Sequence, residues 1–202
     1  MIKILDSKNS NYLSKLRLLL EKRRLGSKIN TDNVIKIVKD IKKNKRKALI
    51  KYEKKFSKNV KIKPSINEIN NSIKSLDPKI KSAIDFAYSR ILKFHSFQKT
   101  KNIKYLDKQN NKIEYRYIPI QSIGIYVPAN LPSTLLMNAI PAKKIAKVKR
   151  VVLANPRLNG KLNPAVMYAA KKCGISEIVS AGGSQAIASL AYIQKVNKII
   201  GP

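Results

Sequence analysis

The chain has 202 residues, of which 44% are hydrophobic, so it can bury one full core or two small ones. This composition excludes a disordered protein, and the longest nearly apolar run, Ala186 to Ile193, is too short to cross a membrane. The chain has 43 lysines and arginines against 11 acids, a net charge of +32. Most of the basic residues are lysines, and they are spread along the chain. We therefore expect a solvated basic surface rather than a nucleic-acid-binding patch.

Residues 1–120 are predicted to form a helical region that ends in a strand or hairpin. Apolar residues at helical spacing predict core-facing stripes in four stretches, 34–41, 48–56, 66–73 and 80–94. Ser65 precedes the third stretch and Asp77-Pro78 the fourth, and both are typical helix starts. Between Ile103 and Ile120 apolar and polar residues alternate, which predicts an antiparallel strand or hairpin.

Residues 121–202 alternate between strand and helix patterns. Strands are predicted at 123–127, 150–154, 177–181 and from 198, and helices at 133–148, 163–172 and 184–193. Ser133 is expected to cap the first helix and Pro141 to kink it, while Asn163-Pro164 begins the second and Gly174 ends it. This alternation is typical of a parallel sheet with right-handed crossovers. The predicted fold class is therefore α/β, with an N-terminal helical region at 1–120 and an incomplete Rossmann-like parallel sheet, helices on both faces, at 121–202.

Two neighbouring glycines, Gly182 and Gly183, separate the third predicted strand from the helix that follows it. Such a turn lets a ligand phosphate approach the helix N-terminus, and Gln185 in the first turn could hydrogen-bond a ribose or an amide. Tyr126 ends the first strand, so in a doubly wound sheet it points into the crevice where ligands bind. From the residues alone, a plain turn with a solvated glutamine is an equal alternative, and a core position for Tyr126 is the favoured one.

His95 is the only histidine in the chain and Cys173 the only cysteine. A single histidine without cysteine or carboxylate neighbours cannot make a zinc site, so we expect His95 to be a structural helix residue. Cys173 precedes Gly174 at a predicted helix end and is expected to be packed and inert. A lone cysteine also excludes an internal disulfide, which fits a cytoplasmic protein.

Four segments together carry a family resemblance. They are IGIYVPANLPSTLLMNAIPAKKIAKVKRVVLANP from Ile123 to Pro156, CGISEIVSAGGSQAIASLAY from Cys173 to Tyr192, VNKIIGP from Val196 to Pro202, and FHSFQ from Phe94 to Gln98. Their order and spacing resemble histidinol dehydrogenase, whose pattern includes Y-V-P, P-S-T-x-L-M-N-A-I-P-A, G-G-x-Q-A-I-A-A-L-A and V-D-K-I-x-G-P-G-N. The likeness extends over nearly the whole chain and corresponds to the N-terminal half of the family.

The resemblance implies an NAD-linked, zinc-dependent oxidoreductase of histidine biosynthesis that oxidises L-histidinol to L-histidine. It also implies a homodimer without membrane attachment. Tyr126 and Gln185 match family residues that contact NAD, which makes them the cofactor-binding candidates. The family's zinc ligands, acid/base pair and substrate-binding residues lie in its other half, so the resemblance implies no catalytic and no metal-binding residue here. We therefore expect the chain alone to be inactive.

Two departures from the family pattern bear on this expectation. Lys45-Arg46 stands where the family usually has Gly-Asp, which removes a turn signal and an acid. Ala129-Asn130 replaces a Gly-Gly after Y-V-P, in a shorter loop. If that loop needs a left-handed backbone, a residue with a Cβ costs about 1–3 kcal/mol there, and NAD binding should weaken; a different path without strain is the alternative.

Two other classes of function stay open at this point. One is a stand-alone basic protein that binds nucleic acid through its lysine-rich helices, and the other is a degenerate, non-catalytic paralogue. Salt dependence separates the first from a dehydrogenase, because neutralising phosphates gives binding a steep salt slope.

Overall fold

A four-stranded parallel sheet lies at the centre of the computed structural model, which describes residues 5–26 and 31–202. Its strands are β3 (Ser122–Tyr126), β4 (Arg150–Ala154), β5 (Glu177–Val179) and β6 (Lys198–Ile200), in the order β5-β4-β3-β6. Every neighbouring pair is parallel. The four predicted strands and the α/β fold class are confirmed.

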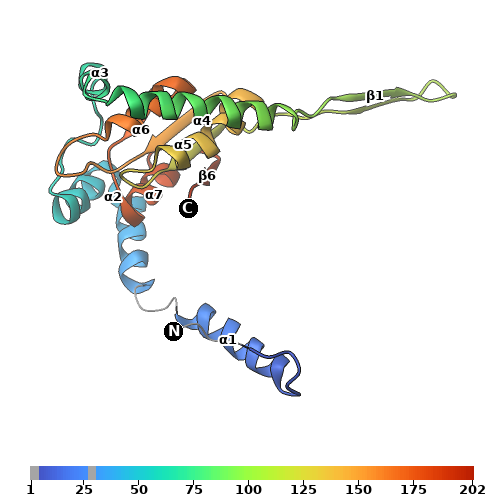
Figure 1. The fold of residues 1–202 in the computed structure, drawn as a ribbon, viewed down its shortest axis with the longest axis horizontal. Coiled ribbons are helices and arrows are strands. Elements are labelled where there is room, and N and C mark those ends of the chain that lie inside the picture. The colour runs from blue at the N-terminus through green and yellow to red at the C-terminus, as the bar shows by residue number, and fades with distance from the viewer. Residues whose placement is uncertain (1–4, 27–30) are drawn as a thin grey trace.

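Helices cover both faces of this sheet, as Figure 1 shows. One face carries α4 (Pro78–Ser96), α5 (Pro132–Ala139) and α6 (Pro164–Cys173), with α3 (Ile66–Lys74) packed beside α6. The other face carries α2 (Thr31–Ser57) and α7 (Gly183–Tyr192). The first helix, α1, spans Tyr12–Gly26. Strand β4 shows the division, because Val151 and Leu153 join the first core cluster while Val152 and Ala154 join the second. The core is therefore two apolar layers separated by the sheet.

Most predicted helix boundaries are confirmed in the local hydrogen bonds. The Ser65 side chain accepts from the N–H of Glu68 at the start of α3, and Asp77 caps α4 next to Pro78. The predicted cap at Ser133 is wrong. Helix α5 begins one residue earlier at Pro132 without a side-chain cap, which fits a proline that has no N–H to satisfy.

The predicted start and end of the second crossover helix are also confirmed. Asn163 accepts from the N–H of Val166 at the start of α6, and Gly174 ends that helix in the left-handed conformation. The kink predicted at Pro141 takes the form of a π-helical turn, Ile140–Ile145, that continues directly from α5.

Helix α2 runs through the two stretches that the sequence separates, with a kink at Lys45. The backbone there has φ 49° and ψ −125°, a region that glycine adopts easily and a lysine does not. The turn therefore persists at the position where the resemblance leads us to expect glycine, although this chain has Lys45-Arg46.

Replacing Lys45 by glycine should stabilise the fold because it removes this backbone strain. We expect Lys45→Gly to raise the free energy of unfolding by about 1–2 kcal/mol and the melting temperature by about 2–8 °C, measured by thermal and urea denaturation. Lys43→Gly is the matched control, since Lys43 is exposed on the same helix but does not lie at the kink. Its free energy of unfolding should be about 1 kcal/mol lower than that of the unmodified protein. A Lys45→Gly variant as unstable as Lys43→Gly would contradict the strain at this site.

The antiparallel hairpin predicted after α4 is confirmed, with β1 (Ile103–Leu106) paired to β2 (Lys112–Tyr115). Figure 1 shows it projecting away from the layered body. Its apolar side chains lie in the open on both faces, with Tyr105, Leu106, Ile113 and Tyr115 each more than half exposed. The alternation of apolar and polar residues therefore predicts the hairpin correctly, although neither face of the hairpin is buried.

The division of the chain at residue 120 stays a proposal. Helices α2 and α4, which precede it, contribute Leu49 and Ile84 to the two core clusters that the later strands also form. Among the described residues, no helix is long and apolar enough to span a membrane.

Candidate functional site

Tyr126 is the last residue of β3, at the carboxyl edge of the sheet. The strand order reverses here, because β4 and β5 extend the sheet on one side of β3 while β6 joins it on the other. Doubly wound α/β proteins bind ligands at such a switch point. Gly201 lies against Tyr126, and a Cβ on this glycine would stand 2.7 Å from the Tyr126 carbonyl oxygen, so the close approach needs glycine.

The Gly182-Gly183 turn joins β5 to α7 beside Tyr126. The Tyr126 hydroxyl accepts a hydrogen bond from the N–H of Gly183 at 3.3 Å. Gly183 has a left-handed backbone with φ 60°, and a Cβ on Gly182 would lie 2.9 Å from the Cβ of Pro156. Both glycines are thus required, the first by the packing against the end of β4 and the second by its conformation.

Gln185 stands in the first turn of α7 and is only 4% exposed. Its side-chain Nε2 donates to Oε1 of Glu53 at 2.8 Å. Its Oε1 lies over the turn, 3.1 Å from where a Cβ on Gly183 would be. The structure therefore brings both sequence candidates to one place, because Tyr126 and Gln185 each contact the same glycine turn.

Glu53 on α2 is a member of this site that the sequence analysis missed. It is fully buried, and the same Oε1 that binds Gln185 also accepts the N–H of Gly182 at 3.0 Å. A signal was present, since Glu53 follows the buried Leu49 by one helical turn and so puts an acid on the apolar stripe. The N–H groups of Gly182 and Gly183 are both engaged by side chains, so they are not open to the ligand phosphate considered from the sequence.

Asn155 is a second residue whose role the sequence analysis did not predict. It is fully buried, and its Nδ2 donates to the carbonyl oxygens of Val127 and Pro128 at 3.0 Å each. These two bonds fix the start of the loop that follows Tyr126. Asn155 therefore shapes the backbone on the Tyr126 side of the site.

The expectation of backbone strain in the loop after Tyr126 is wrong. Neither Ala129 nor Asn130 is among the described residues with positive φ. The loop follows a path that residues with a Cβ adopt without cost, which is the alternative that the sequence left open. The replacement of Gly-Gly here therefore gives no reason to expect weakened ligand binding.

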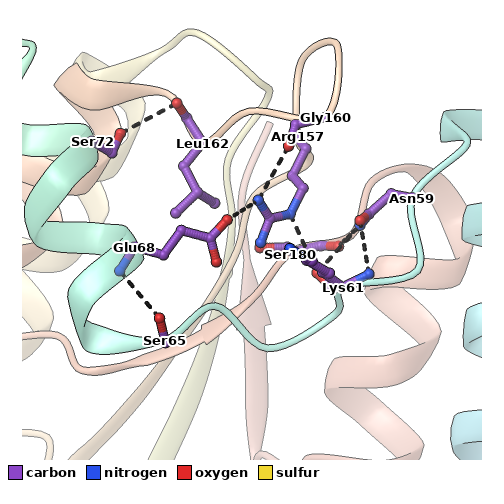
Figure 2. A network of polar contacts seen from close by, with 9 residues as sticks. All are labelled: Asn59, Lys61, Ser65, Glu68, Ser72, Arg157, Gly160, Leu162 and Ser180. Carbon is purple, nitrogen blue, oxygen red and sulfur yellow. Dashed lines mark hydrogen bonds and ion pairs between the residues drawn. The ribbon is translucent and has the colours of Figure 1, made fainter.

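A polar network connects the segment between α2 and α3 to residues that follow β4 and β5 (Figure 2). Asn59 donates from Nδ2 to the carbonyl oxygen of Ser180 at 2.9 Å, and Ser180 donates its N–H to the carbonyl of Ile62. Arg157, whose side chain is 2% exposed, binds Glu68 of α3 and the carbonyl of Lys61. The residues just before the glycine turn are thus fixed by α2 and the segment after it.

His95 and Cys173 lie where the sequence placed them. His95 is in the last turn of α4, with Nδ1 2.6 Å from Oε1 of Gln98. Cys173 ends α6 and is buried, and burial raises the pKa of its thiol to about 11, which fits an unreactive side chain. Within the described part of the chain, no three His, Cys, Asp or Glu side chains are grouped so that they could hold a metal ion.

A parallel sheet with helices on both faces, and a glycine turn bonded to Tyr126 at its switch point, defines this chain as a doubly wound α/β protein. Comparison with known proteins makes the assignment specific. The profile of the family described as histidinol dehydrogenase matches residues 20–202, so the chain belongs to the histidinol dehydrogenase family. The resemblance inferred from the sequence motifs is confirmed.

Individual relatives agree with this family assignment. The chain is 59% identical to the histidinol dehydrogenase of Pelagibacter ubique (strain HTCC1062), over 100% of this chain and 49% of that protein. It is 34% identical to that of Rhodospirillum rubrum, over 98% of this chain and 48% of that protein. The crystal structure of histidinol dehydrogenase from Elizabethkingia anophelis superposes with a TM-score of 0.78 at 36% identity, covering 86% of this chain and 42% of that one. The chain thus spans about half the length of its relatives, as expected for part of a histidinol dehydrogenase.

Proposed function

We propose that this chain supplies part of the NAD site of a histidinol dehydrogenase, with Tyr126 and Gln185 against the cofactor. The observation that carries the proposal is that both side chains contact the Gly182-Gly183 turn, with Tyr126 standing at the switch point of the sheet. Ligands of doubly wound proteins bind at this place, and the family membership points to a dehydrogenase.

The residues at the turn fit a group that carries hydroxyls, such as a ribose of NAD. The Tyr126 oxygen accepts from Gly183, so its own proton is free to be donated to a ligand. The Gln185 Oε1 lies over the turn as an acceptor for a ligand hydroxyl. When bound, NAD supplies the hydride acceptor, and the role of these protein groups is to bind and orient it.

The reaction of the whole enzyme is proposed from the family alone. It is the NAD-linked oxidation of L-histidinol to L-histidine, by a cytoplasmic homodimer that uses zinc. The described residues do not fit zinc, since they hold no group of three possible ligands. We propose that the zinc ligands, the acid/base residues and the substrate site belong to the portion of the relatives that this chain does not span, so no step through zinc involves a residue described here.

The test is a titration of the purified chain with NAD, followed by amide chemical shifts. We expect saturable shifts of Gly182, Gly183 and Gln185 with a dissociation constant in the millimolar range, since only part of the site is present. Gln185→Ala should weaken binding about tenfold, the loss of one or two hydrogen bonds, and Tyr126→Phe should weaken it similarly.

Gln109→Ala is the matched control for this titration. Gln109 is exposed at the tip of the β1–β2 hairpin, far along the chain from the turn. The Gln109→Ala variant should therefore bind NAD as the unmodified protein does. The proposed site would be refuted if several millimolar NAD shifted no resonance near Gly183. It would also be refuted if NAD shifted the resonances near Gly183 equally in the Gln109→Ala and Gln185→Ala variants.

A further inference from the structure

The carboxyl group of Glu53 lies at the N-terminal end of α7, although Glu53 itself belongs to α2. One oxygen, Oε1, accepts both the N–H of Gly182 at 3.0 Å and the Nε2 of Gln185 at 2.8 Å. Gly182 is the N-cap position of α7 and has no side chain with which to cap the helix. Glu53, which is 129 residues away in the chain, therefore caps the helix in place of a local side chain.

This arrangement fixes which end of the Gln185 amide is offered to a ligand. Gln185 is 4% exposed, so an amide hydrogen without a partner would be costly. The Nε2 group finds its partner in Glu53, which directs Oε1 over the turn beside Gly183. The reversed amide would place two oxygens against each other, so Glu53 excludes it.

We propose that Glu53 is a positioning residue that holds Gln185 with its amide oxygen as the ligand-facing acceptor. Through the bond to Gly182, it also holds the turn that carries Gln185. The identity of the ligand as NAD rests on the proposed function, whereas the orientation of Gln185 does not. The two parts are therefore tested by separate measurements.

The chemistry of Glu53 provides a conservative variant. Its second oxygen, Oε2, is buried and has no hydrogen-bond partner. Because Oε1 alone makes both contacts, a glutamine at this position can keep them with its own carbonyl oxygen. Glu53→Gln should therefore retain the positioning, while Glu53→Ala should lose it.

Hydrogen exchange of the Gln185 side-chain amide tests the orientation without any ligand. We expect one Nε2 hydrogen of Gln185 to exchange at least tenfold more slowly than those of the exposed Gln109, in the unmodified chain and in Glu53→Gln. In Glu53→Ala this protection should disappear. A Gln185 amide that is as protected in Glu53→Ala as in the unmodified chain would overturn the proposal.

A double-mutant cycle with NAD tests whether Glu53 acts through Gln185. Glu53→Ala should weaken NAD binding as much as Gln185→Ala does, about tenfold, and the double variant should be no weaker than Gln185→Ala alone. Glu53→Gln should bind within about threefold of the unmodified chain. Additive losses in the double variant would show that Glu53 does not act through Gln185.

Asn59→Ala separates positioning from loss of stability. Asn59 also connects the end of α2 to this turn, through Ser180, but it does not contact Gln185. This variant should melt earlier, yet keep the protected Gln185 amide and bind NAD within about threefold of the unmodified chain. If Asn59→Ala loses that protection as well, Glu53 has only a structural role. If NAD binds none of these proteins, the proposed function fails, and amide exchange still decides the orientation.

Discussion

Glu68→Ala is expected to lower the free energy of unfolding by about 2–4 kcal/mol, because it leaves the buried guanidinium of Arg157 without its anion. The Arg157 side chain is 2% exposed, and its remaining acceptors are the carbonyl oxygens of Lys61 and Gly160. Its Nη2 already lacks a partner, so the site has little capacity to compensate. Urea denaturation followed by circular dichroism measures the loss.

Glu177→Ala is the control for this measurement, since Glu177 pairs with Arg150 at the surface and should cost less than about 1 kcal/mol. The pH dependence gives a second check. The hydrogen bond from Arg157 lowers the pKa of Glu68, so the stability that Glu68 contributes is present above its ordinary pKa of about 4.5 and is lost as the pH falls through and below that value. Equal losses for Glu68→Ala and Glu177→Ala at pH 7, or a gap that widens on acidification, would show that the ion pair is not a structural anchor.

Self-association is the second large effect that we expect. The β1–β2 hairpin exposes more than half of each of Tyr105, Leu106, Ile113 and Tyr115, and two strands alone have too little buried surface to be stable in water. Size-exclusion chromatography with light scattering should therefore show dimers or larger species. Replacing these four residues by threonine, which keeps strand propensity but removes apolar surface, should shift the protein toward the monomer.

Phe97→Ser is the control for the hairpin variant. Phe97 is 81% exposed but lies at the end of α4, outside the hairpin strands, so its loss should leave the association unchanged. An unmodified chain that stays a monodisperse monomer over a wide concentration range would contradict the prediction.

The sheet and its helices were predictable because their signals are local. Short β-branched runs end in Pro, Asn or Gly, and the caps at Ser65, Asp77 and Asn163 lie next to the helices that they begin. The position of Tyr126 followed from the topology of a parallel sheet. Even the error at Ser133 is local, because Pro132 starts that helix without needing a side-chain cap.

The supporting residues of the site could not be predicted in the same way. Glu53 and Asn155 act through contacts with residues far away in the sequence, and nothing in the residues beside them indicates those partners. The hairpin shows a second limit, since alternation predicts a strand but does not say whether another surface covers it. Local pattern thus identifies an element, and only the assembled fold shows what it contacts.

The bonds that connect α2 to the glycine turn also bear on how the chain folds. Glu53 and Gly182 are 129 residues apart, and Asn59 and Ser180 are 121 apart. Closing loops of this length has an entropic cost, so we expect contacts of this kind to form after local helices and neighbouring strands. During synthesis, Glu53 leaves the ribosome long before Gly182 and Gln185, and its carboxyl group stays in water until they arrive. We therefore expect the candidate binding turn to reach its final conformation in the same late step that buries α2 against α7.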